Sequence, residues 1–388
     1  MRQPSNSALV WLLMGAVAVV GSNSLALSPI LGDVAADLGT TPVAIARASA
    51  AYGGATAASA LALGRLIDRY GAERALVAGL AALAVAMAAS AAANHWFGLA
   101  LAQAGAGIAA GIVLPAAYAL AAAVAPEGRS AETLGRVLTG WSVALVAGVP
   151  VSAAIAGAFS WRASYGLFAV ALAGAALLFP RRARASSAAS PIGLGEALRR
   201  PGVAALLSIC LLFMTAFYGV YAFLGDHVRR LQELAAAQAG WVVLAYGVGF
   251  GLGSFADRAL DRFGAGRLLS PVMAALALVY AALIPAAATL PASLAVATAW
   301  GAVNHLGLNL LVLGLTRAVP EGRGAVLALN SAVSYGGALL GALGFGLLYE
   351  FGGFAPVAGA AALCAALAAG LALSWKPRRS TVRVATSP

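Results

Sequence analysis

Two short stretches, DRYGAER at residues 68–74 and DRFGAGR at residues 261–267, repeat one pattern 193 positions apart. Each contains an aspartate, an arginine, an aromatic residue followed by glycine, and a final arginine. Each also stands between two long apolar segments. Because only 10% of the residues are charged, such a match indicates that the two halves of the chain share one organisation.

Further matches at the same or nearly the same spacing support this division. PEGR at residues 126–129 returns 194 positions later, at residues 320–323, and Asp33 has Asp226 as its counterpart at 193. An arginine-rich, Ser- and Pro-containing linker lies near the middle of the chain. We therefore expect an N-terminal bundle at 1–180, a cytoplasmic linker at 181–200, a C-terminal bundle at 201–374 and a cytoplasmic tail at 375–388.

The composition predicts an all-α membrane protein. The chain has 388 residues, of which 62% are hydrophobic, and its mean hydropathy is +0.91. A membrane-spanning helix needs about 20 apolar residues, and apolar runs of that length recur along the sequence. They predict twelve spans, at 8–31, 43–66, 75–93, 96–122, 137–159, 163–180, 203–225, 236–256, 268–287, 291–316, 325–349 and 354–374.

The positive charges predict the orientation of these spans. With a cytoplasmic N-terminus, all but four of the 24 Lys and Arg residues lie on the cytoplasmic side, as the positive-inside rule requires. The net charge of +11 therefore reflects topology rather than binding to nucleic acid. The apolar run after Arg2 is longer than the core of a signal peptide, so we interpret it as a retained first span. The expected location is the bacterial inner membrane, with both termini cytoplasmic.

The first copy of the repeat, extended to residues 64–74, resembles the signature loop of the major facilitator superfamily. That resemblance implies two pseudo-symmetric six-helix bundles that pivot about a central site, with the loop as part of a gate. An aspartate at a helix terminus can pair with a helix N-terminus or a nearby arginine, and such a contact can form in one state and break in the other. The gating residues implied are Gly64, Asp68, Arg69, Gly71 and Arg74, with Asp261, Arg262 and Gly264 in the second copy.

A second resemblance concerns the fifth predicted span and the turn after it. The stretches at residues 140–151 and 160–165 are similar to motifs of the twelve-span drug:proton antiporters, and most similar to bacterial arabinose-like sugar and nucleoside efflux permeases. Gly148 and Pro150 are added to the gating candidates on this basis, since proline bends a helix and glycine lets helices approach closely. The sequence departs from the family at Leu101, where an arginine is usual, and the middle of the first span has no acidic residue.

Ionisable residues within or near the spans are candidates for proton coupling, since burying them in hydrocarbon is costly. Asp33 and Asp226 lie at the non-cytoplasmic ends of the first and seventh spans. The alternative for both is a role as interfacial caps. Arg47 lies one or two turns inside the second span, where its guanidinium could instead snorkel to the interface. His305 is the first candidate for a proton-linked step because histidine titrates near neutral pH.

Neutral polar residues in the apolar spans are candidates for binding a solute. His305 and Asn309 are four residues apart and so share one helix face. The two side chains could line a cavity or serve in packing. Hydrogen bonding between helices is the alternative for each candidate. The substrate-binding candidates are Asn23, Gln103, Tyr118, Tyr218, Tyr221, Asn304, His305, Asn309, Asn330 and Tyr335.

Several classes of protein are disfavoured by what the sequence contains. We find no phosphate-binding loop, no zinc-type His/Cys spacing and no Ser/His/Asp arrangement, so no enzyme activity, cofactor or metal is expected. Cys210 and Cys364 lie inside apolar runs and are expected to behave as small hydrophobic residues.

We therefore expect a monomeric secondary transporter in the lipid bilayer that exports a drug-like, sugar or nucleoside solute by proton antiport. A proton-linked or facilitated importer with the same fold is the main alternative. A non-transporting membrane receptor or assembly factor is a remote one, because the sequence offers no docking domain beyond a short tail.

Overall fold

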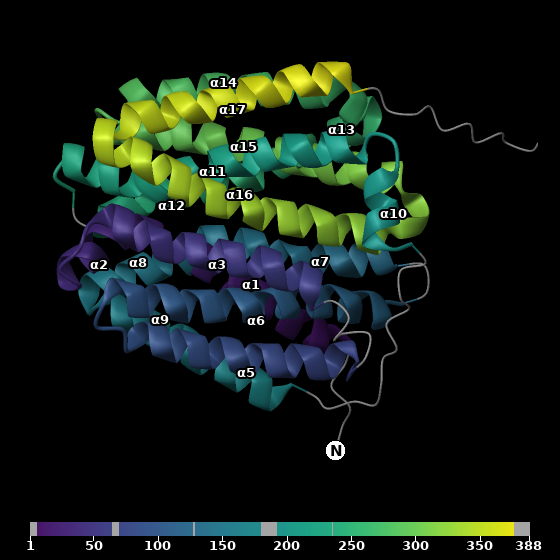
Figure 1. The fold of residues 1–388 in the computed structure, drawn as a ribbon, viewed down its shortest axis with the longest axis horizontal. Helices are drawn as coiled ribbons and strands as arrows, with labels where there is room; N and C mark the ends of the chain where they lie inside the picture. Colours follow the sequence, from purple (N-terminus) through teal and green to yellow (C-terminus); the bar gives the residue numbers. More distant parts are fainter. Residues whose placement is uncertain (1–5, 64–69, 127–128, 180–191, 235, 376–388) are drawn as a thin grey trace, which may run out of the picture.

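A computed structural model describes residues 6–63, 70–126, 129–179, 192–234 and 236–375. The described residues form helices joined by short turns and contain no strand. The long helices run side by side along the longest axis of the molecule (Figure 1). The first half of the chain occupies one side of this arrangement, and the second half occupies the other.

The helices of the first half lie at the predicted spans. The first span is divided by η1, and the fifth is divided by η2. The helices pack chiefly as α3 against α6, α6 against α5, α5 against α9, and α1 against α7. Their bounds are α1 Asn6–Ala26, η1 Ser28–Ile30, α2 Leu31–Asp37, α3 Pro42–Ala62, α5 Ala72–Ala91, α6 Trp96–Ala123, α7 Ser130–Val143, η2 Ala144–Gly148, α8 Val149–Ala158 and α9 Trp161–Leu178.

The second half follows the same order after the short helix α10 (Leu194–Arg199). Here α11 packs against α16 and α17, α12 against α15, and α14 against α15 and α17. The bounds are α11 Val203–Leu231, α12 Ala236–Gly253, η3 Ser254–Ala256, α13 Asp257–Phe263, α14 Ala265–Ala286, α15 Leu290–Ala318, η4 Pro320–Gly322, α16 Arg323–Gly352 and α17 Phe354–Ser374.

These helices confirm the predicted all-α membrane fold. Within the described residues, ten helical segments are long and apolar enough to cross a bilayer, and Gly240–Ala256 forms a shorter apolar helix. Helix α3 has the length of a span at 21 residues, but Arg47 and several small polar residues lower its hydropathy. Helix α11 continues to Leu231, beyond the predicted end at residue 225. Arg229 and Arg230 lie in its last turn, where positive charge favours a helix C-terminus.

The regular α-helix of the fifth span is interrupted next to Gly148 and Pro150. A π-helical turn, η2, separates α7 from α8 immediately before the proline. Because proline has no backbone N–H and clashes with the preceding turn, an enlarged turn accommodates it. A Cβ atom at Gly148 would lie only 1.9 Å from Ser22 Oγ of α1. The glycine therefore allows the fifth span to contact α1 directly.

The repeated glycines occupy equivalent places in the two halves. Gly71 precedes α5 with φ +85°, and Gly264 precedes α14 with φ +75°. Both backbones lie in the left-handed region that only glycine adopts without strain. The sequence repeat thus marks two matching turns, each of which leads into the third long helix of its half.

Small residues bring neighbouring helices into close contact. A Cβ atom at Gly107 of α6 would lie 2.3 Å from the carbonyl oxygen of Tyr52 in α3. A Cβ atom at Gly111 would lie 1.9 Å from Ser59 Oγ of the same helix. Glycines of this kind let helix backbones approach closely in a membrane, so they fix the packing of α3 on α6.

The two halves also meet one another. Helix α3 packs along α16, and α12 packs against α8 and η2. The segment η1 and helix α2 contact α11. We call the end of the molecule that carries α2 and the start of α9 the α2 end; α10 and α13 lie at the opposite end (Figure 1). The boundaries at 1–180 and 201–374 stay a prediction for the units that would move.

Candidate functional site

A cavity lies between the two groups of helices, about halfway along α3. Residues of α1, η1, α2, α3, α11 and α16 line it, and its volume of about 20 Å³ is close to the room that one water molecule needs. The described lining carries hydroxyl groups and apolar side chains but no charged side chain. The polar lining residues are Ser24, Ser28, Ser49, Tyr52, Tyr218, Tyr221 and Tyr335.

Aromatic rings give this cavity a rigid wall. Tyr52 of α3 and Tyr335 of α16 meet edge to face across the two halves, with ring centroids 6.0 Å apart. The hydroxyl group of Tyr221 is buried and has no hydrogen-bond partner among the described residues. Since an unpaired buried hydroxyl group is costly, Tyr221 is suited to bind a polar group of a solute.

A second, smaller hollow of about 10 Å³ shares Ser28 and Tyr221 with the first and extends toward α12 and α15. Tyr246 and Trp300 line it, and their ring centroids are 4.7 Å apart. Asn304 donates a hydrogen bond to the Tyr246 hydroxyl oxygen at 2.7 Å. The side chain of Asn304 therefore positions an aromatic wall rather than reaching into the central cavity.

The structure separates the other substrate-binding candidates. Tyr218, Tyr221 and Tyr335 line the cavity. Asn23 and Gln103 form a buried amide pair, with Asn23 Nδ2 3.1 Å from Gln103 Oε1, and Gln103 also donates to Ser90. Two further candidates accept hydrogen bonds: Tyr118 from Trp141 at 3.1 Å, and Asn330 from Cys210 at 3.4 Å.

Sequence reasoning missed several lining residues. Tyr52 and the three serines at 24, 28 and 49 were not singled out. Tyr52 lies in the middle of an apolar span, and a polar aromatic residue at that depth was a usable signal. The serines gave none, because serine is common on packed helix faces in membranes.

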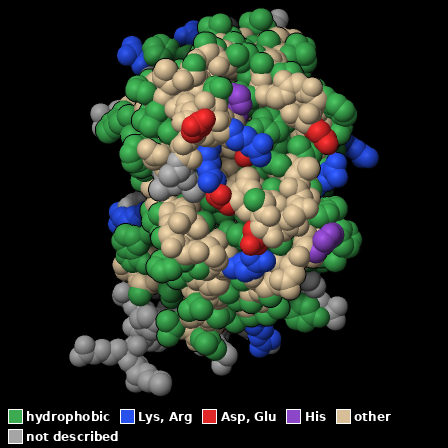
Figure 2. All heavy atoms as spheres, turned by 90° about the vertical axis from the view of Figure 1, so that its left-hand side faces the viewer, with side chains coloured by type: hydrophobic (Ala, Val, Ile, Leu, Met, Phe, Trp, Pro, Cys, Tyr) green, Lys and Arg blue, Asp and Glu red, His purple; other side chains and the backbone are tan. Residues whose placement is uncertain are grey.

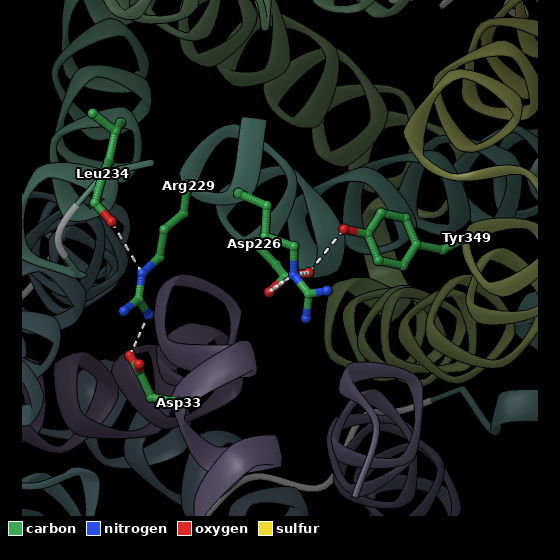
Figure 3. A network of polar contacts seen from close by, with 6 residues as sticks. Asp33, Asp226, Arg229, Leu234 and Tyr349 are labelled. Atoms are coloured by element: carbon green, nitrogen blue, oxygen red, sulfur yellow. Dashed lines mark hydrogen bonds and ion pairs between the residues drawn. The ribbon is translucent and has the colours of Figure 1, made fainter. Parts of the chain in front are cut away.

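Contacts between the two halves close the α2 end. Arg229 of α11 forms an ion pair with Asp33 of α2 and also donates to the carbonyl oxygen of Leu234 (Figure 3). Ser28 of η1 donates to the carbonyl oxygen of Tyr221. Acidic and basic side chains gather in the middle of this end (Figure 2). A solute could pass this end only after such contacts separate.

Asp226, one turn before Arg230 in α11, is buried against the other half. Its carboxylate accepts a hydrogen bond from the Tyr349 hydroxyl group at 2.8 Å (Figure 3) and pairs with Arg230 at 3.0 Å. A Cβ atom at Gly32 of α2 would lie 2.7 Å from Asp226 Oδ1. The carboxylate therefore lies directly against the backbone of the opposite half.

A different ion pair at the α2 end lies entirely within the first half. Asp37 accepts hydrogen bonds from Arg162 and, at 3.0 Å, from the Trp161 indole nitrogen. Arg162 also donates to the carbonyl oxygen of Ala93 at 2.9 Å. This clamp ties α2, α9 and the turn between α5 and α6 together. Arg47 is exposed on α3 and takes no part in the ion pairs of the described residues.

His305 and Asn309 share a face of α15, as predicted, and a carboxylate meets them there. Asp257, the first residue of α13, has its Oδ1 atom 3.0 Å from His305 Nε2 and 2.9 Å from Asn309 Nδ2. Sequence reasoning missed Asp257 because it lies between a predicted span and the repeated loop. Its repeat position, 193 residues after Gly64, was the available signal.

Part of the predicted gate can be placed. Gly64, Asp68 and Arg69 lie outside the described residues, as does the side chain of Asp261. Arg74 is exposed near the start of α5, and Arg262 stacks over the Phe263 ring at 5.5 Å. At this opposite end, Arg200 pairs with Glu321 at 3.0 Å.

Comparison with known proteins agrees with this architecture. The model of the Major Facilitator Superfamily matches residues 12–315, so the chain belongs to that family. An uncharacterized MFS-type transporter, YwfA of Bacillus subtilis, is 30% identical over 345 residues, which cover 85% of this chain and 84% of YwfA. A probable sugar efflux transporter of Mannheimia succiniciproducens is 27% identical over 251 residues, or 63% of each chain. The protein is therefore a multi-pass membrane transporter.

Proposed function

We propose that this transporter exports a small neutral organic solute, such as a sugar, a nucleoside or a drug-like molecule, in exchange for protons. Bundles 1–180 and 201–374 would pivot about the central cavity and expose it to each side of a bacterial inner membrane in turn. In this proposal both termini are cytoplasmic, and the transporter acts as a monomer that needs no cofactor.

The central cavity is the observation that carries this proposal. It lies between the two halves, and its described lining offers hydroxyl groups and aromatic faces without a charged side chain. Pockets of this kind suit ligands that are neutral and partly polar, since a few placed polar groups give orientation and the apolar wall gives affinity. The similarity to a probable sugar efflux transporter supports export of such a solute.

The α2 end supplies a gate for the proposed cycle. Because the predicted topology places this end outside the cytoplasm, the Asp33–Arg229 ion pair would close the outer side. Outward opening would have to break this pair and separate Tyr52 from Tyr335. The repeated loops with Asp68 and Asp261 would act at the cytoplasmic side, and Gly148 and Pro150 would let the fifth span bend.

Four ionisable groups are candidates for proton coupling in this scheme. Asp33, Asp226 and Arg47 lie toward the proposed outer side, and His305 lies nearer the middle of its helix. Asp226 is favoured among the first three because its buried carboxylate contacts Arg230, Tyr349 and the backbone of the other bundle. Protonation there would remove a charge at the interface that must open.

The proposal is tested with everted membrane vesicles whose interior is acidified by respiration and monitored with acridine orange. Addition of arabinose, uridine or ethidium is expected to restore fluorescence, because entry of the exported solute releases protons. Vesicles without the transporter serve as the control.

The importer alternative predicts a different pattern. A proton-linked importer would accumulate labelled arabinose or uridine in right-side-out vesicles and would not restore fluorescence in everted ones. That result would overturn export by antiport while leaving the membership of the transporter family intact.

A further inference from the structure

The second copy of the repeated loop differs from the first at its opening position. Gly64 starts the first copy, and Asp257 stands 193 residues later at the start of the second. Asp257 is also the first residue of α13. The second half therefore has an extra anion where the first half has a glycine.

This anion meets two polar side chains of α15. Asp257 Oδ1 lies 3.0 Å from His305 Nε2 and 2.9 Å from Asn309 Nδ2. A hydrogen on His305 Nε2 would be donated to the carboxylate, and Asn309 Nδ2 also lies 2.9 Å from this ring nitrogen. Asp257 Oδ1 then accepts from both the histidine and the asparagine.

The other ring nitrogen has a different environment. His305 Nδ1 is buried and has no hydrogen-bond partner among the described residues. With Nε2 already bonded to Asp257, Nδ1 is the atom at which the ring gains or loses its second proton. Gain of this proton converts the ring to a cation and takes the histidine and aspartate together from one negative charge to none.

Among the described residues, Asp257 is the charged side chain that pairs with His305. Phe250 of α12 packs edge-on against the His305 ring at 4.9 Å, and Gly253 brings the α12 backbone to within contact of the same residue. Helices α11, α14 and α16 also pack against α15, but their described side chains contribute no ionisable group to the ion pairs or hydrogen bonds of His305. Asp257 is thus the charged partner of the ring.

The two side chains differ in exposure. The side chain of His305 is 12% exposed, whereas that of Asp257 is 44% exposed. Asp257 is therefore the accessible member of the pair, and the ring is largely buried. None of the three residues lines the central cavity, so a proton can bind here while a solute occupies the tyrosine-lined space.

We propose that Asp257 and His305 form a proton-binding site, positioned by Asn309, that is separate from the solute cavity. Asp257 holds the imidazole by its Nε2–H bond and stabilises the ring when Nδ1 takes up a proton. The use of this proton in transport rests on the proposed function, whereas the binding of the proton does not.

Nuclear magnetic resonance of the full chain in detergent, with nitrogen-15-labelled histidine, tests the binding directly. The chain has 3 histidines, and His305→Gln identifies the signals of His305. We expect these signals to report proton uptake by the ring as the pH is lowered. In Asp257→Asn, which lacks the anion, the midpoint of this change should differ from that of the unaltered protein. Asp257→Glu, which keeps the charge, should restore it.

Asp33→Asn is the matched control, since it makes the same chemical change at the α2 end. It should leave the His305 midpoint unchanged. A His305 signal that does not titrate, or a midpoint that is the same in Asp257→Asn and the unaltered protein, would overturn the proposed site. Size-exclusion profiles show whether each variant is folded.

Transport assays then test whether this proton is the coupled one. With a probe found by the vesicle assay, Asp257→Asn should reduce solute-driven proton release by at least about tenfold and retain solute-for-solute exchange. Normal proton release in this variant would exclude the site from coupling. If the unaltered protein moves none of the probes, the proposed function fails, and the histidine titration still decides whether the site exists.

Discussion

Helix α3 packs against α6 on one face and against α16 on another, and the two contacts differ in closeness. Toward α6, a Cβ atom at Gly107 would come within 2.3 Å of a backbone oxygen. Toward α16, a Cβ atom at Gly53 would lie 2.9 Å from Ala338 Cβ and 3.1 Å from the Tyr335 carbonyl oxygen. The first contact joins helices of one half, and the second joins the two halves beside the cavity.

This difference teaches which surfaces are permanent. The α3–α6 contact places backbone against backbone, and no side-chain rotation can make room there. The α3–α16 contact is less close, and it borders the tyrosine-lined cavity. Under the proposed alternating access, the first face should stay together throughout the cycle and the second should separate.

Gly107→Val is expected to have the largest effect. The added side chain overlaps the backbone of α3, so stability should fall by at least about 2 kcal/mol, measured as thermal unfolding in detergent. Gly105→Val is the matched control, since its nearest neighbour is Ala86 Cβ at 3.9 Å and the site is exposed. Equal loss in both variants would show that α6 does not depend on this close contact.

Gly53→Val should act on the arrangement of the halves more than on their stability. We expect a stability loss of under about 1 kcal/mol, because the two halves can separate to relieve the overlap. Spin labels at Phe159 and Phe351, which are 82% and 86% exposed, should report a longer distance. The labelled protein would have Cys210 and Cys364 replaced by alanine. An unchanged distance with a large stability loss would mean that this face is permanent too.

The two ion pairs at the α2 end offer the same comparison between a contact within one half and a contact between the halves. Breaking either pair should have a smaller effect than the glycine substitutions. Arg162→Gln breaks a clamp within one half and should lower stability by roughly 1 kcal/mol without changing the label distance. Arg229→Gln breaks the pair between the halves. It should change stability by about 0–1 kcal/mol but lengthen the label distance. A longer label distance in Arg162→Gln and an unchanged one in Arg229→Gln would contradict the proposed gate.

Tyr52→Phe should have the smallest effect. The hydroxyl group of Tyr52 donates a long hydrogen bond of 3.4 Å to the carbonyl oxygen of Val20, so its loss should cost under about 1 kcal/mol. If the hydroxyl group also contacts the solute, binding of an active probe should weaken a few-fold. Binding and unfolding measured on the same preparation separate the two roles, and Tyr70→Phe, exposed and away from the cavity, is the control.

The sequence alone predicted the fold. Hydropathy located the spans because each must carry about 20 apolar residues whatever its neighbours are. The repeated loops predicted equivalent turns, which Gly71 and Gly264 form, since a left-handed backbone selects glycine locally. His305 and Asn309 were placed on one face because helix periodicity is also local.

The partners of these residues were decided by the tertiary structure. Asp257 meets His305, Asn23 meets Gln103, and Asn304 meets Tyr246 across gaps of many residues in the sequence. Each pairing depends on how far a helix is rotated and at what angle it crosses its neighbour. Those quantities arise from packing between helices, and no short stretch of sequence carries them.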